Sequence, residues 1–329
     1  MPLSDRLVAE TARDSTDHLR CTYPLAWGLE NFSASCHRVA VRVVFLGLPL
    51  AACLLAKDGH EIVLAGLSRT DTVGRRRLRR MLGPERVLDK PKLDRAFASR
   101  VADLRPDLLV SWFWTNRIPP AVVAAARHGG IGVHPSLLPR HRGPDPTAWA
   151  ILLGDRTTGV TCHRIAEDYD TGDILAQEEI VIGDDWDSWR LARALDAPSL
   201  RVLRQVCRRF AAGDPPPAAA QDESAATAAP FLDEHEQSLA WDEPTERVLR
   251  RIRALAPNPG AFTDVAGHTI TILRASSRVA PACLERAGEA AWLDGRAVVR
   301  TRDGAVALEL VEKDGVPLRD EEVRDLLGT

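Results

Sequence analysis

The stretch Val41-Arg-Val-Val-Phe-Leu-Gly47 decides the fold class of this chain. It is a short run of β-branched and apolar residues that ends in glycine, and the apolar segment that follows it to Lys57 suits a helix. β-Branched residues favour strands, and a glycine after such a run favours a turn. The stretch therefore predicts a strand, a turn and a helix, which is the opening unit of an α/β fold.

The alternation of strands and helices continues beyond Lys57. Strands are predicted over 61–67, 107–112 and 130–134, and helices over 92–104 and 119–127. Extended runs over 160–165 and 174–182 and an amphipathic helix over 188–212 follow. This order predicts a Rossmann-like, open and mostly parallel sheet with flanking helices. Ligands of such sheets bind beyond the carboxyl ends of the strands, which here means 112–118 and 134–140.

The length of 329 residues allows two domains. We expect a poorly defined extension over 1–40, a catalytic domain over 41–212, a linker over 213–230 and a C-terminal domain over 231–329. The linker is rich in Pro and Ala, so it is predicted to lack regular structure. After a helix over 243–255, alternating apolar and polar residues around glycine turns predict a small β-rich domain or barrel of the OB type.

The composition excludes several classes of protein. With 45% hydrophobic and 27% charged residues and a net charge of −3, the chain is typical of globular proteins, and no overall charge draws it to nucleic acid. Its six cysteines lack the spacing of a zinc site, so we expect no metal and a reducing compartment. No apolar run is long enough to cross a membrane, and a cytoplasmic protein is expected.

The densest chemical signal is Ile131-Gly-Val-His-Pro-Ser-Leu-Leu-Pro-Arg-His-Arg-Gly143, a strand that runs into a proline-rich loop. His134 is expected at the mouth of the sheet. The acidic turn Glu167-Asp-Tyr-Asp-Thr-Gly-Asp173 lies between two predicted strands and can return a carboxylate to that mouth. A carboxylate beside an imidazole stabilises the protonated ring and fixes its tautomer, so a pair of this kind suits acid–base work. The sequence identifies no partner for His128 or His141.

Three linked segments carry a resemblance to a known family. His134-Pro-Ser-Leu-Leu-Pro-Arg-His-Arg-Gly143, Gly154-Asp-Arg-Thr-Thr-Gly-Val-Thr161 and Asp170-Thr-Gly-Asp-Ile-Leu175 resemble, in order and spacing, the core of the 10-formyltetrahydrofolate-dependent formyltransferases. Gln221-Asp-Glu-Ser-Ala-Ala-Thr-Ala-Ala-Pro230 and Arg251-Ile-Arg-Ala-Leu-Ala-Pro-Asn-Pro-Gly-Ala-Phe262 are similar to the linker and C-terminal domain of the methionyl-tRNA formyltransferases. The resemblance runs from about Val41 to the C-terminus.

The resemblance implies direct transfer of a formyl group from N10 of the co-substrate 10-formyltetrahydrofolate to an amine, through a tetrahedral intermediate. An Asn, a His and an Asp do this work in the family, and His134 and Asp170 match the last two. By analogy, protonated His134 stabilises the oxyanion, and Asp170 supports the imidazolium. The family's tetrahydrofolate-binding loop is matched by Ser136, Leu137, Leu138 and Pro139, and the segment that lines its pteridine pocket by Thr115, Asn116, Arg117 and Ile118.

The chain departs from the family at the asparagine. Gly132 occupies this catalytic position, two residues before His134, so the usual side-chain donor to the oxyanion is absent. Loss of one such donor typically lowers the rate by about 10²–10³. Three explanations follow: a slow enzyme, a donor supplied from elsewhere, such as Asn116 or a backbone N–H, or a catalytically impaired relative that binds folate or RNA.

An arginine run bears on the acceptor amine. Gly74-Arg-Arg-Arg-Leu-Arg-Arg80 stands where the tRNA enzymes carry a basic insertion. Contact with the phosphates of initiator methionyl-tRNA is therefore expected from Arg75, Arg76, Arg77, Arg79 and Arg80. A solvated helix face is the other interpretation of this run.

Two further features favour a different acceptor. Residues 231–329 hold 18 acidic and 13 basic side chains, whereas a domain that lies along RNA usually has a basic face. Cys162-His-Arg-Ile165 resembles the corresponding stretch of sugar-nucleotide N-formyltransferases, so His163 is a candidate substrate contact, or else an exposed strand residue. The alternative acceptor is a small amine, such as an amino sugar nucleotide or a carrier-bound amino acid.

Overall fold

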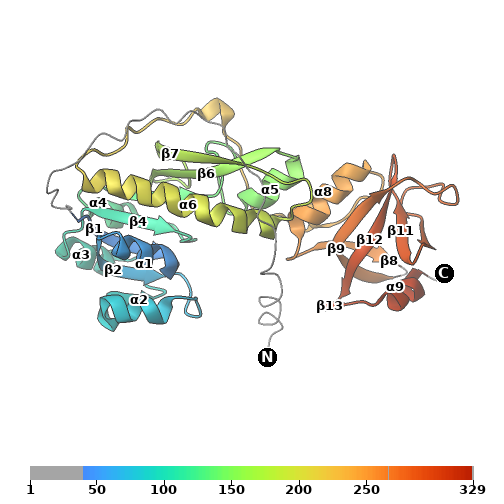
Figure 1. Cartoon of the computed structure of the whole chain (residues 1–329), viewed down its shortest axis with the longest axis horizontal. Coiled ribbons are helices and arrows are strands. Elements are labelled where there is room, and N and C mark those ends of the chain that lie inside the picture. The colour runs from blue at the N-terminus through green and yellow to red at the C-terminus, as the bar shows by residue number, and fades with distance from the viewer. Residues whose placement is uncertain (1–39, 266, 328–329) are drawn as a thin grey trace, which may run out of the picture. The chain divides into compact units, whose positions relative to one another are not determined.

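This computed structural model describes residues 40–265 and 267–327. These residues form two β-sheets with their flanking helices. The expected extension over 1–40 lies outside the described residues, apart from Ala40. Figure 1 shows the first sheet with its helices and the second sheet near the C-terminus. The predicted fold class, an α/β sheet followed by a β-rich part, is confirmed.

The first sheet has seven strands in the order β3-β2-β1-β4-β5-β6-β7. Five of them run parallel: β1 (Arg42–Gly47), β2 (Glu61–Leu67), β3 (Val87–Asp89), β4 (Leu108–Trp112) and β5 (Gly130–His134). The last two are added antiparallel: β6 (Thr157–Arg164) and β7 (Ile174–Val181). The strand order reverses between β1 and β4, which is where the ligand crevice of an open sheet lies.

Helices cover both faces of this sheet. Pairs of helices share each face: α1 (Pro49–Lys57) and α6 (Ser188–Ala211) on one, α3 (Arg95–Asp103) and α4 (Pro120–Ala124) on the other. Val43 and Phe45 of β1 pack with the first pair, and Val44 and Leu46 with the second. Successive strand side chains point to opposite faces, so a strand buried on both faces is apolar throughout. No helix in the described ranges is long and apolar enough to cross a membrane.

The second sheet is antiparallel, in the order β10-β11-β12-β9-β8, with β13 paired to β12. Its strands are β8 (Ala261–Val265), β9 (His268–Arg278), β10 (Ala290–Leu293), β11 (Arg296–Arg300), β12 (Ala305–Lys313) and β13 (Val316–Pro317). Two helices accompany it: α8 (Thr245–Leu255) and α9 (Asp320–Leu327). α8 contacts β9 with one apolar face, as its sequence pattern predicts.

Several elements lie where the sequence predicts none. The helices among them are α5 (Pro146–Leu153), the short α7 (Glu234–Gln237) and α9. α2 (Arg75–Leu82) forms over the arginine run, for which a helix face is one interpretation, and its apolar residues Leu78, Met81 and Leu82 have helical spacing. α5 is apolar almost throughout, so it has no amphipathic period. β3 has three residues, which is too short to give a pattern.

The segment predicted as a linker, 213–230, runs along the first sheet. It contains one short 3₁₀ turn, η3 (Glu223–Ala225). The other short 3₁₀ turn of the described residues, η2 (Pro84–Arg86), lies outside this segment and precedes β3. Isolated bridges join Ala219 to Ile174 and Ala228 to Arg142. The segment has little regular structure, and backbone hydrogen bonds attach it to β7 and to the loop that follows β5.

Gly47 closes β1 where a side chain cannot fit. Its φ is +137°, and a Cβ there would lie 1.8 Å from the carbonyl oxygen of Trp112. We expect Gly47→Ala to lower the free energy of unfolding by at least about 3 kcal/mol, because it adds a backbone clash to an unfavourable φ. Gly59→Ala is the matched control: its φ is +96° with nothing within 4 Å, so about 1–2 kcal/mol is expected. Urea denaturation measures both, and equal losses would contradict the assignment.

Candidate active site

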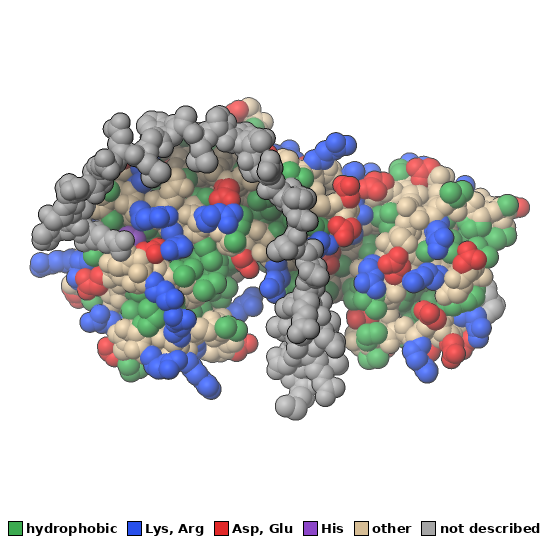
Figure 2. All heavy atoms as spheres, in the orientation of Figure 1, with side chains coloured by type: hydrophobic (Ala, Val, Ile, Leu, Met, Phe, Trp, Pro, Cys, Tyr) green, Lys and Arg blue, Asp and Glu red, His purple; other side chains and the backbone are tan. Residues whose placement is uncertain are grey.

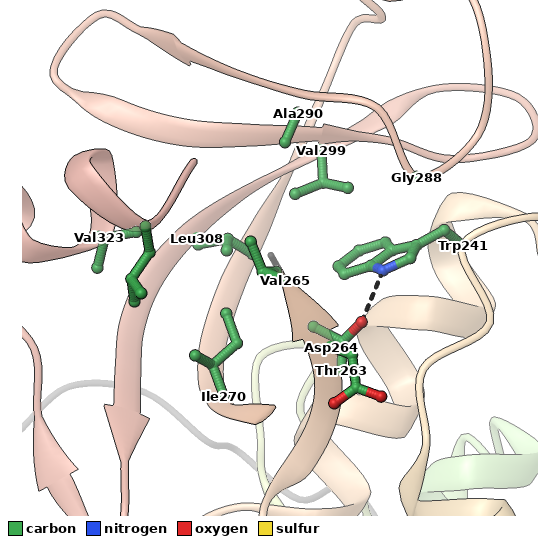
Figure 3. A pocket seen from close by; sticks show the side chains of 11 residues that line it. Trp241, Thr263, Asp264, Val265, Ile270, Gly288, Ala290, Val299, Leu308 and Val323 are labelled. Atoms are coloured by element: carbon green, nitrogen blue, oxygen red, sulfur yellow. Dashed lines mark hydrogen bonds between the residues drawn. The ribbon is translucent and has the colours of Figure 1, made fainter. Parts of the chain in front are cut away.

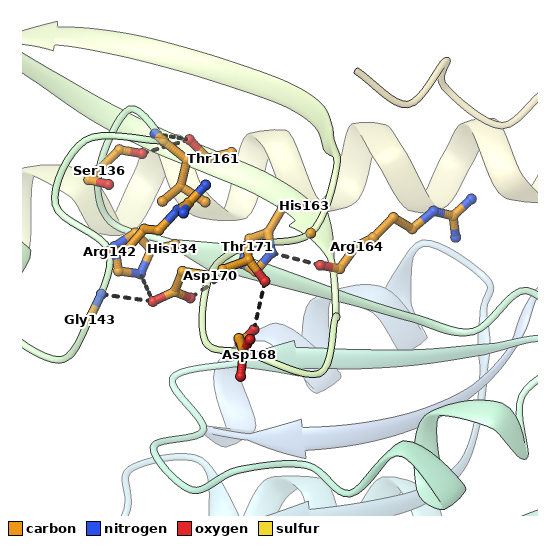
Figure 4. Close-up of polar contacts among 12 residues, drawn as sticks. His134, Ser136, Arg142, Gly143, Thr161, His163, Arg164, Asp168, Asp170 and Thr171 are labelled. Carbon is orange, nitrogen blue, oxygen red and sulfur yellow. Dashed lines mark hydrogen bonds and ion pairs between the residues drawn. The ribbon is translucent and has the colours of Figure 1, made fainter. Parts of the chain in front are cut away.

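The site forms where two loops meet around the end of β5. One loop follows His134, the last residue of β5. The other is the turn between β6 and β7, which starts beside Gly130 and folds back over the sheet. Figure 4 shows Asp170 of this turn between His134 and His163. The structure therefore brings together His134 and Asp170, the two residues that the family resemblance pairs.

Both ring nitrogens of His134 have protein partners. Nε2 lies 2.8 Å from the carbonyl oxygen of His141, so Nε2 carries a proton and donates it. Nδ1 lies 3.4 Å from Oδ2 of Asp170. The imidazole is buried, so these two groups fix its orientation. A proton taken up on Nδ1 would face a carboxylate.

Asp170 is held in a left-handed backbone conformation, with φ of +58°. Aspartate tolerates this region better than most residues. Its Oδ2 accepts a hydrogen bond of 3.0 Å from the N–H of Gly143, and its Oδ1 lies 3.6 Å from Nε2 of His163. One carboxylate thus contacts two imidazoles and a backbone amide (Figure 4).

The side chain of His163 fills the space beside Gly132. The two residues stand opposite each other in the antiparallel pairing of β5 and β6. A Cβ built on Gly132 would lie 3.4 Å from Nε2 of His163. His163 is 6% exposed, so it is a buried residue at the site and not an exposed strand residue. The absent asparagine side chain and the added imidazole therefore occupy neighbouring positions.

Burial lowers the pKa of His163 to about 4. The Asp170 carboxylate acts in the opposite direction, and His134 adds to the lowering. Nδ1 of His163 donates to the carbonyl oxygen of Arg164 at 2.8 Å. At neutral pH the ring is therefore uncharged, and Nε2 carries a lone pair. His163 is chemically a proton acceptor.

The predicted folate-binding loop is braced by the antiparallel strands. Thr161 of β6 accepts the N–H of Leu138 at 3.0 Å and donates to the carbonyl oxygen of Ser136 at 2.7 Å. Gln177 of β7 donates to the carbonyl oxygen of Leu138 at 2.9 Å. The other two members of the loop are half-buried: Leu137 and Pro139. Sequence reasoning did not single out Thr161 or Gln177, because their pairing with the loop depends on strand register.

The predicted pteridine segment lies at the end of β4. Its first three residues, Thr115, Asn116 and Arg117, are exposed, and Ile118 is buried. Arg117 donates from Nη2 to the carbonyl oxygen of Glu167 at 3.0 Å, which ties this segment to the turn that holds Asp170.

The arginines of α2 divide into two groups. Arg76, Arg77 and Arg80 are exposed. Arg75 instead forms a bidentate ion pair with Asp89 of β3, and Nε of Arg79 is buried. Figure 2 shows Lys and Arg side chains gathered at the lower left, where Figure 1 places α2. Three of the five predicted contacts are therefore free to meet a ligand.

His141 is a site residue that sequence reasoning missed. It is 1% exposed, with φ of +59°, and its Nε2 lies 2.7 Å from Oδ2 of Asp155. This pair fixes the backbone carbonyl that accepts the His134 proton. Asp155 belongs to the second segment of the family resemblance, but nothing in its spacing joins it to His141.

A cavity of about 240 Å³ lies in the second sheet (Figure 3). Trp241 donates to Oγ1 of Thr263 there at 3.0 Å. Asp264 is the one ionisable group among the described residues that line the cavity, so it offers no acid–base pair. Across the described ranges, no cluster of three or more His, Cys, Asp or Glu side chains is placed to hold a metal ion.

Comparisons with known proteins agree with this geometry. Residues 48–207 match the family described as formyl transferase, and residues 232–320 match the formyl transferase C-terminal domain. A methionyl-tRNA formyltransferase of Anaeromyxobacter dehalogenans is 34% identical, over 84% of this chain and 94% of that protein. One from Chlorobium limicola is 31% identical, over 84% and 92%. The chain belongs to the formyl transferase family. The resemblance to the folate-dependent formyltransferases is thereby confirmed.

Solved structures share the fold of this formyltransferase. HypX from Aquifex aeolicus in complex with tetrahydrofolic acid superposes with a TM-score of 0.62 at 23% identity, over 86% of this chain. The chain spans about half of HypX, 46% of its length. An N-formyltransferase from Helicobacter canadensis, in complex with folinic acid and dTDP-3-aminofucose, has a TM-score of 0.63 at 12% identity, over 82% of this chain and 99% of that one.

The low pKa of His163 predicts a pH dependence of stability. An unfolded chain binds a proton at histidine below pH about 6.5, whereas folded His163 resists one until pH about 4. The stability that neutral His163 contributes to the formyltransferase should therefore be fully present above about pH 6.5. The free energy of unfolding should fall by up to about 3 kcal/mol as the pH is lowered towards 4. Denaturation between pH 7 and pH 4.5 measures this loss.

The His163→Met variant should lose much less stability over the same pH range, because its residue 163 does not titrate. The matched control is His235→Gln, whose native ring is exposed and should leave the wild-type slope unchanged. Identical slopes in wild type and His163→Met would contradict the assignment.

Proposed function

We propose that this formyltransferase transfers the formyl group of 10-formyltetrahydrofolate to the amino group of initiator methionyl-tRNA. The observation that carries the proposal is the Asp170 carboxylate in contact with His134, His163 and the Gly143 amide. Transfer between two nitrogens needs a group that takes a proton from the amine and a group that stabilises the oxyanion. The acceptor is supported by methionyl-tRNA formyltransferases that are 34% and 31% identical to this protein, each over 84% of the chain.

His134 is the proposed oxyanion-stabilising residue. Its Nε2–H bonds to the His141 carbonyl, and this hydrogen bond can pass to the formyl oxygen when the co-substrate enters. The carboxylate of Asp170, beside Nδ1, would stabilise the imidazolium while negative charge develops on that oxygen. Asp170 thus acts on the reaction through the imidazole.

His163 is the proposed acceptor of the amine proton. Its Nε2 is unprotonated at neutral pH, and the Oδ1 of Asp170 stands 3.6 Å away to stabilise the imidazolium that forms. As the amine attacks, its nitrogen bonds to the formyl carbon and one proton moves to Nε2. The carbon–N10 bond then breaks, and N10 takes that proton, so the proton balance closes.

The co-substrate is proposed to lie between the loop 136–139 and the segment 115–118. Trp114, immediately before that segment, has a buried indole N–H with no partner in the described part of the chain. An unpaired buried donor is costly, so a polar ring edge at this position would satisfy it. The polar groups of Ser136 and Leu138 already bond within the protein, so this loop would contribute shape.

The acceptor is proposed to contact α2 through its phosphates. Arg76, Arg77 and Arg80 are exposed there, whereas Arg75 is held by Asp89 and supports the helix. Each phosphate that an arginine neutralises releases counterions, so binding of methionyl-tRNA would weaken as salt rises.

A small amine, such as an amino sugar nucleotide, is the second candidate acceptor. On α8, Arg250 pairs with Glu246, and Arg247 and Arg251 pair with Glu243. These pairs neutralise much of the basic face that RNA would need there.

The cytoplasm is the proposed location of the protein. The described cysteines have free thiols, which supports a reducing compartment: Cys53, Cys162, Cys207 and Cys283.

Label transfer tests the acceptor. Purified protein is incubated with formyl-labelled 10-formyltetrahydrofolate and either methionyl-tRNA or an amino sugar nucleotide. We expect transfer to methionyl-tRNA, and a loss of at least about tenfold in kcat/KM, with a flatter salt dependence, when Arg76, Arg77 and Arg80 are replaced by Gln. Arg286→Gln, at an 86% exposed side chain of the second sheet's loops, is the matched control.

Other outcomes have distinct meanings. Transfer to the sugar nucleotide alone would replace methionyl-tRNA with the second candidate. Transfer to neither acceptor, with folate still bound, would overturn the proposed reaction in favour of an impaired binding protein.

Gly132→Asn tests the missing oxyanion donor. A side-chain donor of this kind is worth about 10²–10³ in rate, so we expect kcat to rise by about tenfold or more. Gly132→Ala is the matched control: its Cβ fits in van der Waals contact, 3.4 Å from His163, but adds no donor, so kcat should stay unchanged. If kcat in Gly132→Asn is unchanged or lower while folate binding is intact, the missing donor does not limit the rate.

A further inference from the structure

Gln221, in the segment between the two sheets, joins both loops of the active site. Its Nε2 donates to the carbonyl oxygens of Asp170 at 2.8 Å and Gly172 at 2.7 Å. Its Oε1 accepts from Nε of Arg142 at 3.0 Å and from Nη2 at 2.7 Å. A carboxamide has two N–H donors and two lone pairs, so these four bonds use its full capacity. Gln221 is therefore fixed in one orientation by groups on two loops.

The turn that Gln221 binds needs external support. Asp170 has φ of +58°, and a Cβ on Gly172 would lie 1.9 Å from the carbonyl oxygen of Arg164, so the backbone is tightly folded here. The carboxylate of Asp170 lies 3.4 Å from His134 and 3.6 Å from His163. At these distances a small displacement of the turn changes both contacts.

The opposite end of the Gln221 carboxamide holds the other loop. Arg142 precedes Gly143, whose N–H donates to Oδ2 of Asp170. Gln221 thus binds Arg142, which is next to the donor Gly143, and Asp170, whose carboxylate accepts that hydrogen bond. The distance between the two loops is set across this one side chain.

The residues after Gln221 continue the attachment, and we name 219–229 the linker strap. The N–H of Arg142 donates to the carbonyl oxygen of Thr227 at 2.8 Å, and the N–H of Ala229 donates to the carbonyl oxygen of Arg142 at 2.7 Å. The N–H of His141 donates to Oγ1 of Thr227 at 2.8 Å. The linker strap therefore lies beside the loop whose His141 carbonyl accepts the proton of His134.

We propose that Gln221 is a positioning residue for formyl transfer, which holds the Asp170 carboxylate against His134 and Gly143. Through Gln221, the linker strap then supports the active site as well as connecting two parts of the chain. The kinetic consequence rests on the proposed function, whereas the structural consequence does not.

Kinetics of full-length variants test the proposal. Gln221→Met preserves length but removes all four hydrogen bonds, and Gln221→Glu keeps an acceptor for Arg142 but loses both donors to the turn. We expect each to lower kcat for formyl transfer about 10- to 100-fold, with KM for either substrate changed less than about twofold, because the turn is misplaced. In an Asp170→Asn background the same substitutions should cause no further loss, because Gln221 acts through Asp170.

The matched control is Glu223→Gln. It removes the negative charge and one acceptor oxygen from the other side-chain partner of Arg142, the Glu223 carboxylate at 2.7 Å, and leaves Gln221 in place. Its kcat should stay within about twofold of wild type. A wild-type kcat in the two Gln221 variants, or losses that multiply with Asp170→Asn, would overturn the proposal.

Amide exchange gives a readout that needs no turnover. The Gly143 N–H is protected by its bond to Asp170, so its hydrogen exchange should be at least about tenfold faster in Gln221→Met or Gln221→Glu and unchanged in Glu223→Gln. Unchanged exchange in both Gln221 variants would overturn the proposal. Faster exchange, in a protein that transfers formyl to no acceptor, would support the role of Gln221 and overturn the proposed reaction alone.

Discussion

The antiparallel pairing of β5 with β6 is the interaction on which the rest of the site depends. It sets Gly132 opposite His163 and starts the return turn beside Gly130, so that the turn folds back and Asp170 reaches the end of β5. The imidazole of His163, from the next strand, lies 3.4 Å from the position that a Cβ would take at Gly132. The same pairing places Thr161 against the loop 136–139. One register therefore positions the two histidines beside Asp170 and braces the neighbouring loop.

The two histidines differ in what their surroundings leave free. Both ring nitrogens of His134 meet protein groups, one a carbonyl and one a carboxylate. His163 uses one nitrogen on a backbone carbonyl, and burial keeps the other unprotonated. A carboxylate shared by two such rings suits a reaction in which one nitrogen gives up a proton and another receives one. Nε2 of neutral His163 carries no proton, so this nitrogen does not replace the side-chain donor that is absent at position 132.

Support for Asp170 comes from outside the turn that contains it and outside the first sheet. The turn is tightly folded and has a left-handed residue, and its carbonyl groups bond to Gln221 of the linker strap. His141 is similarly braced, by Asp155 on one side and Thr227 on the other. The segment that leads towards the second sheet thus contributes to the geometry of the first. A displacement of the linker strap would therefore also displace the Asp170 carboxylate.

The sequence alone determined the strands of the first sheet other than β3, and the pair His134 and Asp170. Runs such as 41–47 and 130–134 are recognisable because strands buried on both faces must be apolar throughout, and local order with spacing sufficed to match His134 and Asp170 to the formyltransferases. α5 escaped prediction because it has no amphipathic period. Only the tertiary structure decided that His163 is buried beside Gly132, that His141 pairs with Asp155, and that Gln221 holds the Asp170 turn. These contacts depend on strand register and on the path of a returning turn, and no local pattern of residues encodes which distant segments will meet.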